Sequence, residues 1–104
     1  MKMMLREISK VLPGKLAEAQ EIEKMERELA ERRGGPPPAV TRYIPFARHG
    51  DRMQTIVHQV ELPSLAALAA GLEKSRENPE IRDIEAKWEA VLESHIIELY
   101  IVVE

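Results

Sequence analysis

The chain opens with apolar side chains on both faces of a strand pattern. Met3–Val11 places Leu5 on one face and Ile8 on the other. Since successive side chains of a strand point to opposite sides, this pattern indicates a strand that is covered on both faces. Pro13 lacks a backbone donor and Gly14 permits a tight turn, so the strand is expected to end there.

Residues 15–33 repeat apolar side chains every three or four positions, which predicts an amphipathic helix. The apolar stripe consists of Leu16, Ala19, Ile22, Met25, Leu29 and Ala30. The charged residues between them, including Glu18, Glu21, Glu23 and Glu26, are assigned to the solvent-facing side. The sequence Gly-Gly-Pro-Pro-Pro at 34–38 is expected to end the helix, since proline cannot continue it.

Two strands are predicted in the middle of the chain. Residues 39–46 are rich in β-branched and aromatic side chains, and Pro45 places the end of that strand at a sheet edge or a bulge. Residues 53–62 form the next strand. The glycine-centred sequence His49-Gly50-Asp51 lies between them, so an antiparallel hairpin is expected.

The last third predicts two helices and a strand. Pro63-Ser64 opens the first helix, and Asn78-Pro79 restarts the chain as the second, since Asn caps helices and Pro suits their first position. The stripe of the second helix is Ile81, Ile84, Trp88, Val91 and Leu92. Residues 96–103 have hardly any polar side chain except Glu98, which predicts a strand buried on both faces.

The order strand, helix, strand, strand, helix pair, strand is the split β-α-β pattern of ferredoxin-like folds. The sequence therefore predicts a single α+β domain over residues 1–104, with a four-stranded antiparallel sheet and helices on one face. The other face is too apolar to meet water. A second copy is expected to cover it, as a homodimer through the sheet face that forms a dimeric α/β barrel.

Composition narrows the function classes. The 104 residues carry a formal net charge of −3 with both signs interspersed, so no basic surface for nucleic acid is expected. Cysteine is absent, which excludes thiolate catalysis and favours a reducing compartment. No apolar run is long enough for a signal peptide or a membrane span. These features predict a soluble, cytoplasmic protein without a membrane partner.

Four side chains are candidates for ligand binding: Arg6, Arg42, His58 and His49. His58 lies mid-strand among apolar residues, where it is either a ligand contact or a hydrogen-bonded structural histidine. For Arg42 and Arg6 a carboxylate clamp and a salt bridge both stay open. His49 lies in the predicted turn, where a solvated side chain is the simpler interpretation. The histidines do not have metal-ligand spacing, so neither a metal site nor a cofactor is expected.

A set of short segments in order resembles NIPSNAP-like proteins of the dimeric α/β-barrel superfamily. The segments are Leu5-Arg6-Glu7-Ile8, Val11-Leu12-Pro13-Gly14-Lys15-Leu16, His49-Gly50-Asp51, Ile56-Val57-His58-Gln59-Val60-Glu61, Asn78-Pro79-Glu80 and Glu98-Leu99-Tyr100. The resemblance covers nearly the whole chain. It implies a dimer whose two sheets form a barrel, with a pocket beneath each sheet, and it implies no particular activity and no catalytic residue.

Three hypotheses for the function follow. The first is a homodimeric barrel that binds a small apolar or acidic molecule in a pocket between sheet and helices, ringed by Arg6, Arg42 and His58. The second is a cofactor-independent monooxygenase or isomerase, in which His58 or His49 accepts a proton. The third is a structural interaction module without a pocket. The fold by itself does not choose among them.

Overall fold

The computed structural model describes residues 1–33, 40–45 and 54–103. Within these ranges the order of elements is β1 (Met3–Val11), α1 (Leu16–Arg33), β2 (Val40–Tyr43), β3 (Thr55–Leu62), α2 (Leu65–Glu77), α3 (Pro79–Val91) and β4 (Leu92–Ile101). The strands form one antiparallel sheet in the order β2-β3-β1-β4. The predicted ferredoxin-like α+β fold with a four-stranded antiparallel sheet is confirmed.

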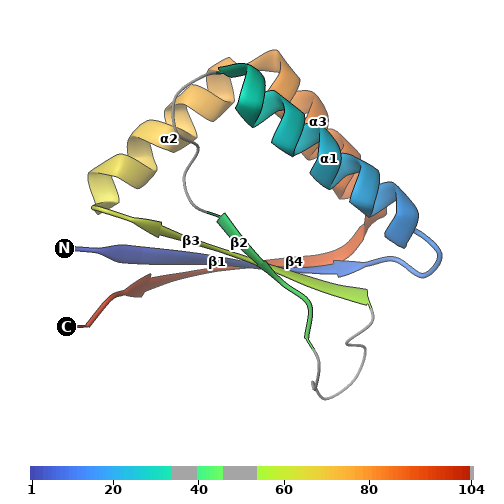
Figure 1. Cartoon of the computed structure of the whole chain (residues 1–104), viewed down its shortest axis with the longest axis horizontal. Helices are drawn as coiled ribbons and strands as arrows, with labels where there is room; N and C mark the ends of the chain where they lie inside the picture. The colour runs from blue at the N-terminus through green and yellow to red at the C-terminus, as the bar shows by residue number, and fades with distance from the viewer. Residues whose placement is uncertain (34–39, 46–53, 104) are drawn as a thin grey trace.

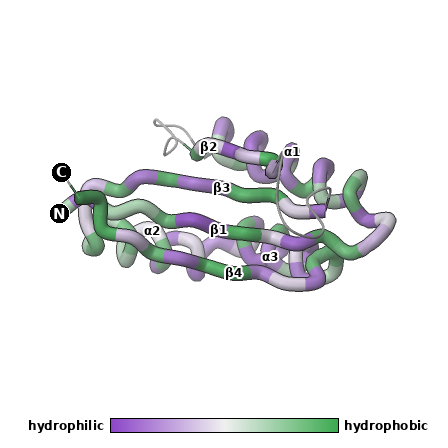
Figure 2. The backbone as a smooth tube through the Cα atoms, turned by 90° about the horizontal axis from the view of Figure 1, so that it is seen from below, coloured by the Kyte–Doolittle hydropathy of each residue, from purple (hydrophilic) through white to green (hydrophobic). Residues whose placement is uncertain are grey.

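The described helices all lie on one side of the sheet (Figure 1). Helices α1 and α3 lie side by side over one end of the sheet, and α2 lies over the opposite end (Figure 1). Seen from below, the sheet presents a second face that no described helix covers (Figure 2). The chain therefore has a helix-facing side and an open face.

Local signals place most of the element boundaries correctly. Gly14, in the turn between β1 and α1, has a φ of +79°, a conformation that favours glycine. Ser64 caps α2, because its Oγ accepts a hydrogen bond from the backbone N–H of Ala67 at 3.1 Å. Asn78 caps α3 by accepting from the backbone N–H of Glu80 at 2.9 Å. The helices begin where the capping residues predict.

The bounds of three predicted strands differ from the structure. The strand predicted at 53–62 is described as Thr55–Leu62. Of the strand predicted at 39–46, the described residues 40–45 form a strand over Val40–Tyr43, and the hairpin turn with His49 lies outside the described residues. The strand predicted from residue 96 begins four residues earlier, at Leu92, which was assigned to the preceding helix. Leu92 has the extended backbone of a helix C-cap, with φ −99° and ψ 135°, so α3 passes directly into β4.

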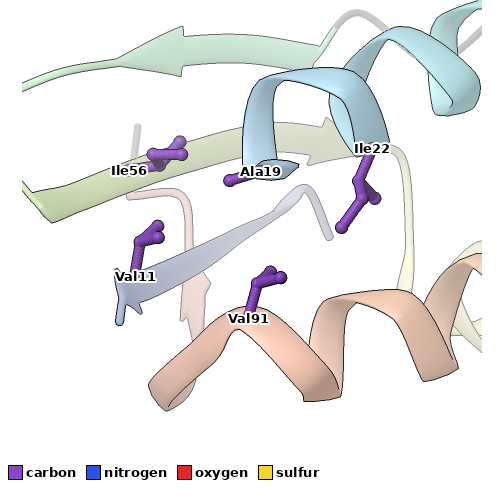
Figure 3. Packing of buried hydrophobic residues seen from close by; sticks show 5 residues of the cluster. All are labelled: Val11, Ala19, Ile22, Ile56 and Val91. Carbon is purple, nitrogen blue, oxygen red and sulfur yellow. The ribbon is translucent and has the colours of Figure 1, made fainter. Parts of the chain in front are cut away.

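A small apolar core lies at one end of the sheet (Figure 3). It consists of Val11, Ala19, Ile22, Ile56 and Val91, from α1, α3, β1 and β3. Ile56 and Ser9 pair across β3 and β1, and both are buried, so their faces of these strands are the helix-facing side. The alternation of side chains then assigns Glu7, Leu5, His58 and Val60 to the same side.

Candidate functional site

A polar row crosses the helix-facing side next to the core. In the sheet register Arg42 of β2 pairs with His58 of β3, and His58 pairs with Glu7 of β1. The next row along consists of Val40, Val60 and Leu5. Because paired residues of neighbouring strands project to the same face, a charged row here lies beside an apolar row.

Helix α1 brings a carboxylate onto the polar row. Glu23 is only 7% exposed. Its Oε2 accepts a hydrogen bond from Nε of Arg42 and lies 3.2 Å from Nε2 of His58. A buried carboxylate needs such partners, because its transfer from water is otherwise strongly unfavourable. The sheet thus supplies the cationic and donor groups that permit Glu23 to be buried.

A second carboxylate of α1 lies one turn further along. Glu26 Oε1 accepts a hydrogen bond from Nε1 of Trp88 on α3 at 2.8 Å. Burial raises the pKa of the Glu26 carboxyl above its usual range, and the hydrogen bond from Trp88 opposes that rise. On the sheet side Glu7 Oε2 lies 3.4 Å from Nε2 of His95 on β4.

Glu7, Glu26 and His58 border a cavity of about 150 Å³ between the sheet and α1. It is lined by Leu5, Glu7, Glu26, Val40, His58, Gln59 and Val60. A cavity of this size admits a molecule of roughly the size of benzene. The lining combines an apolar row with one imidazole and two carboxylates, which are groups that can bind a polar substituent or transfer a proton.

The structure brings two of the four predicted site residues together. His58 and Arg42 meet at Glu23, and His58 also lines the cavity, whereas Arg42 does not. Arg6 lies on the open face, where its Nε donates to Oε1 of Gln59 at 2.8 Å. Its guanidinium also lies 5.2 Å from the ring centroid of Tyr100. His49 lies outside the described residues.

The sequence interpretation missed the carboxylates, and the assignment of Glu23 to the solvent-facing side was wrong. Glu23 follows Ala19 by four positions, and Ala19 is fully buried. Residues four apart share a helix face, so the spacing to Ala19 was a signal for the burial of Glu23. The sequence interpretation followed hydropathy and placed Glu23 in solvent, because a glutamate is seldom buried without a partner.

No protein-family model and no curated protein matches the sequence. Solved structures do match it. An uncharacterised NIPSNAP-like domain protein from Burkholderia xenovorans superposes with a TM-score of 0.75 at 13% identity, over 98% of this chain and 85% of that one. The chain has the fold of NIPSNAP-like proteins. The predicted resemblance is confirmed at the level of fold.

Two further structures share this NIPSNAP-like fold. A dimeric ferredoxin-like protein of unknown function from Thermobifida fusca superposes with a TM-score of 0.69 at 10% identity, over 98% of this chain and 92% of that one. An antibiotic biosynthesis monooxygenase superposes with a TM-score of 0.64 at 16% identity, over 98% and 99% of the two chains. Uncharacterised proteins and a monooxygenase therefore share this architecture, so the fold alone does not identify the function.

The described helices and the described His, Asp and Glu side chains bear on membrane crossing and on metal binding. None of the helices in ranges 1–33 and 54–103 combines the length and the apolar character that crossing a membrane requires. Within the same described part of the chain, no group of three or more His, Asp or Glu side chains is placed to hold a metal ion.

Proposed function

We propose that this chain is a NIPSNAP-like, cytoplasmic barrel protein that binds a small apolar or acidic molecule in the cavity between the sheet and α1. The observation that carries the proposal is the cavity itself. Its apolar row accommodates a hydrophobic body, while His58 and the two carboxylates of its lining hold a polar group. His58 is the contact residue in this proposal, and Arg42 supports it through Glu23.

We further propose that the protein is a homodimer through the open face. That face carries apolar side chains with large exposed fractions, such as Ile96 (49%) and Tyr100 (39%). A second copy that covers this face removes them from water. The Thermobifida fusca protein with the same fold is a dimeric ferredoxin-like protein, which supports this assembly. In this proposal Arg6 belongs to the interior of the barrel.

The binding proposal is tested by titration of the isotope-labelled protein with toluene and with benzoate, followed by NMR. Binding is expected to shift the resonances of cavity residues such as Leu5 and Val60. The variant Val60→Phe fills the cavity and is expected to abolish these shifts. Ala70→Phe is the matched control, because Ala70 is exposed on α2 and neither lines the cavity nor lies on the open face. If both variants retain the same shifts, the molecule binds elsewhere and the proposal is wrong.

A second candidate function is a cofactor-independent monooxygenase or isomerase. The cavity unites an imidazole with carboxylates, and the monooxygenase with the same fold supports this candidate. In such an enzyme His58 accepts a proton from the substrate. The variant His58→Ala separates the two functions. Loss of turnover with retained affinity indicates the enzyme, and loss of affinity alone indicates the binding protein.

A further inference from the structure

A single carboxylate oxygen of Glu23, Oε2, contacts two side chains. Nε of Arg42 donates to Glu23 Oε2, and Nε2 of His58 lies 3.2 Å from the same atom. The three side chains come from α1, β2 and β3, and Glu23 is almost fully buried between them. The contact between Glu23 and His58 is therefore held by elements of both layers of the fold.

The chemistry of the partners decides which atom carries the hydrogen of the contact between Glu23 and His58. A guanidinium only donates, so the Glu23 oxygen that receives it acts as an acceptor. An ionised carboxylate has no hydrogen to give. The hydrogen between Glu23 Oε2 and His58 must therefore reside on Nε2, and the neutral ring carries its free lone pair on Nδ1.

The other polar side chains that line the cavity also accept. Glu26 Oε1 already receives the hydrogen from Nε1 of Trp88, and Glu7 contributes a further carboxylate. The side chain of Gln59 lies on the open face, where it receives the guanidinium of Arg6. Arg42 does not line the cavity and faces Glu23. In the part of the chain that the structure describes, no side chain of the lining offers a donor to an anion while His58 is neutral.

We propose that Glu23 is a positioning residue that holds His58 with Nε2 protonated, so that Nδ1 receives a hydrogen-bond donor of the ligand. This rests on the proposed binding function and narrows its ligand class. The cavity takes an apolar molecule with an O–H or N–H group and discriminates against a carboxylate. A donor group of the ligand donates a hydrogen bond to Nδ1, whereas an anion meets lone pairs and negative charge.

The positioning role is tested without any ligand, by NMR of the ring nitrogens of His58 at a pH where the ring is neutral. The wild-type ring is expected to carry its proton on Nε2, with slow exchange against water. In Glu23→Gln this exchange is expected to be about ten to a hundred times faster, since a hydrogen bond to a charged group is lost. Glu21→Gln is the matched control, because Glu21 lies on the same helix and is exposed.

Arg42→Gln keeps the test decisive if Glu23→Gln does not fold. This variant leaves the Glu23 carboxylate in place, so the proton is expected to stay on Nε2. Three results overturn the positioning role. They are a wild-type ring protonated on Nδ1, unchanged exchange in Glu23→Gln, and rapid exchange in Arg42→Gln alone, which would assign the role to the arginine.

The ligand class is tested with benzyl alcohol and benzoate, which share an aromatic ring and differ in the polar group. Benzyl alcohol is expected to bind about tenfold more tightly or better and to shift the Nδ1 resonance. Equal or tighter binding of benzoate overturns the ligand class while the binding function stands. If neither probe nor toluene binds, the binding function and the ligand class both fail, whereas the ring measurement still decides the role of Glu23.

Discussion

The polar row on the helix-facing side and the strand β4 differ in what surrounds their side chains. In the polar row a carboxylate that prefers water is buried, because Arg42 and His58 complete its contacts. In β4 apolar side chains that avoid water are exposed: Ile96, Ile97, Leu99, Tyr100 and Ile101 are each at least 39% exposed. The side chains of the first region meet their partners within the chain, whereas those of β4 stay exposed among the residues that the structure describes.

This difference teaches that burial follows from available partners more than from hydropathy. Glu23 is less exposed than any of the apolar residues of β4 between positions 96 and 101. A polar group is buried when donors meet it, and an apolar group stays exposed when nothing lies over it. The comparison predicts that substitutions in the two regions act on different properties: stability in the polar row, and association on the open face of β4.

The largest expected effect is on association. Ile96 pairs with Ile8 on the open face, so Ile96→Glu places a charge in the proposed interface. The dissociation constant of the dimer is expected to rise by about a hundredfold or more, as for loss of a central interface residue. Native mass spectrometry over a range of protein concentrations measures this change.

The neighbouring residue provides the control for that experiment. Ile97 is 60% exposed and lies on the helix-facing side of the same strand, because it pairs with Glu7. Ile97→Glu adds the same charge to the other face and is expected to leave the dimer intact. If Ile97→Glu separates the copies and Ile96→Glu does not, the copies associate through the other side of β4.

A smaller effect is expected on stability when the buried carboxylate is removed. Glu23→Ala leaves Arg42 and His58 without their shared acceptor and is expected to lower the free energy of unfolding by about 2 kcal/mol. Arg42 is partly in contact with water, which limits the loss. Urea unfolding at fixed protein concentration measures it. Glu21→Ala on the exposed side of α1 is expected to change stability by less than about 0.5 kcal/mol, and equal losses would contradict the comparison.

The smallest effect is a pH dependence at Glu26. Its pKa is raised in the folded state, so the folded protein binds the proton more tightly than the unfolded chain. The stability that this contributes is present below the unfolded pKa near 4.5 and is lost as the pH rises through the folded pKa. Glu26→Gln removes this loss and still accepts the hydrogen bond from Trp88.

The variant is therefore expected to gain stability relative to wild type as the pH increases from about 4 to 7. The gain amounts to a few tenths of a kcal/mol, because Glu26 retains contact with water. Thermal unfolding of both proteins across this pH range measures it. Glu21→Gln is expected to show no such trend, and a relative loss for Glu26→Gln at neutral pH would refute the sign of the shift.

Much of the fold was predictable from short stretches of sequence. The strand Met3–Val11 has the predicted bounds, and the caps at Ser64 and Asn78 lie at the predicted helix starts. The start of β4 was placed too late, because Val91 and Leu92 continue the apolar spacing of α3 although the backbone is already extended at Leu92. Hydropathy shows which residues avoid water, and in this junction it does not show where the backbone changes.

Of the candidate site, the sequence indicated His58 and Arg42 by their place among apolar strand residues, and the structure places them on adjacent strands. It did not indicate their common partner. Glu23, Glu26 and Glu7 belong to an acidic chain in which most carboxylates are exposed. Nothing in the residue type therefore distinguished these three glutamates from the exposed ones. Arg6 met the same criteria as Arg42 and lies on the opposite face of the sheet.

The sequence by itself determined the order of the elements, the turn at Gly14, the helix caps and the alternation of faces along each strand. These features depend on residues only a few positions apart, whose contacts the local backbone conformation creates. Only the tertiary structure decided that Glu23 meets Arg42 and His58, which lie 19 and 35 positions further along the chain. Such contacts depend on the register of the sheet and on how α1 packs over it, and no local pattern contains that information.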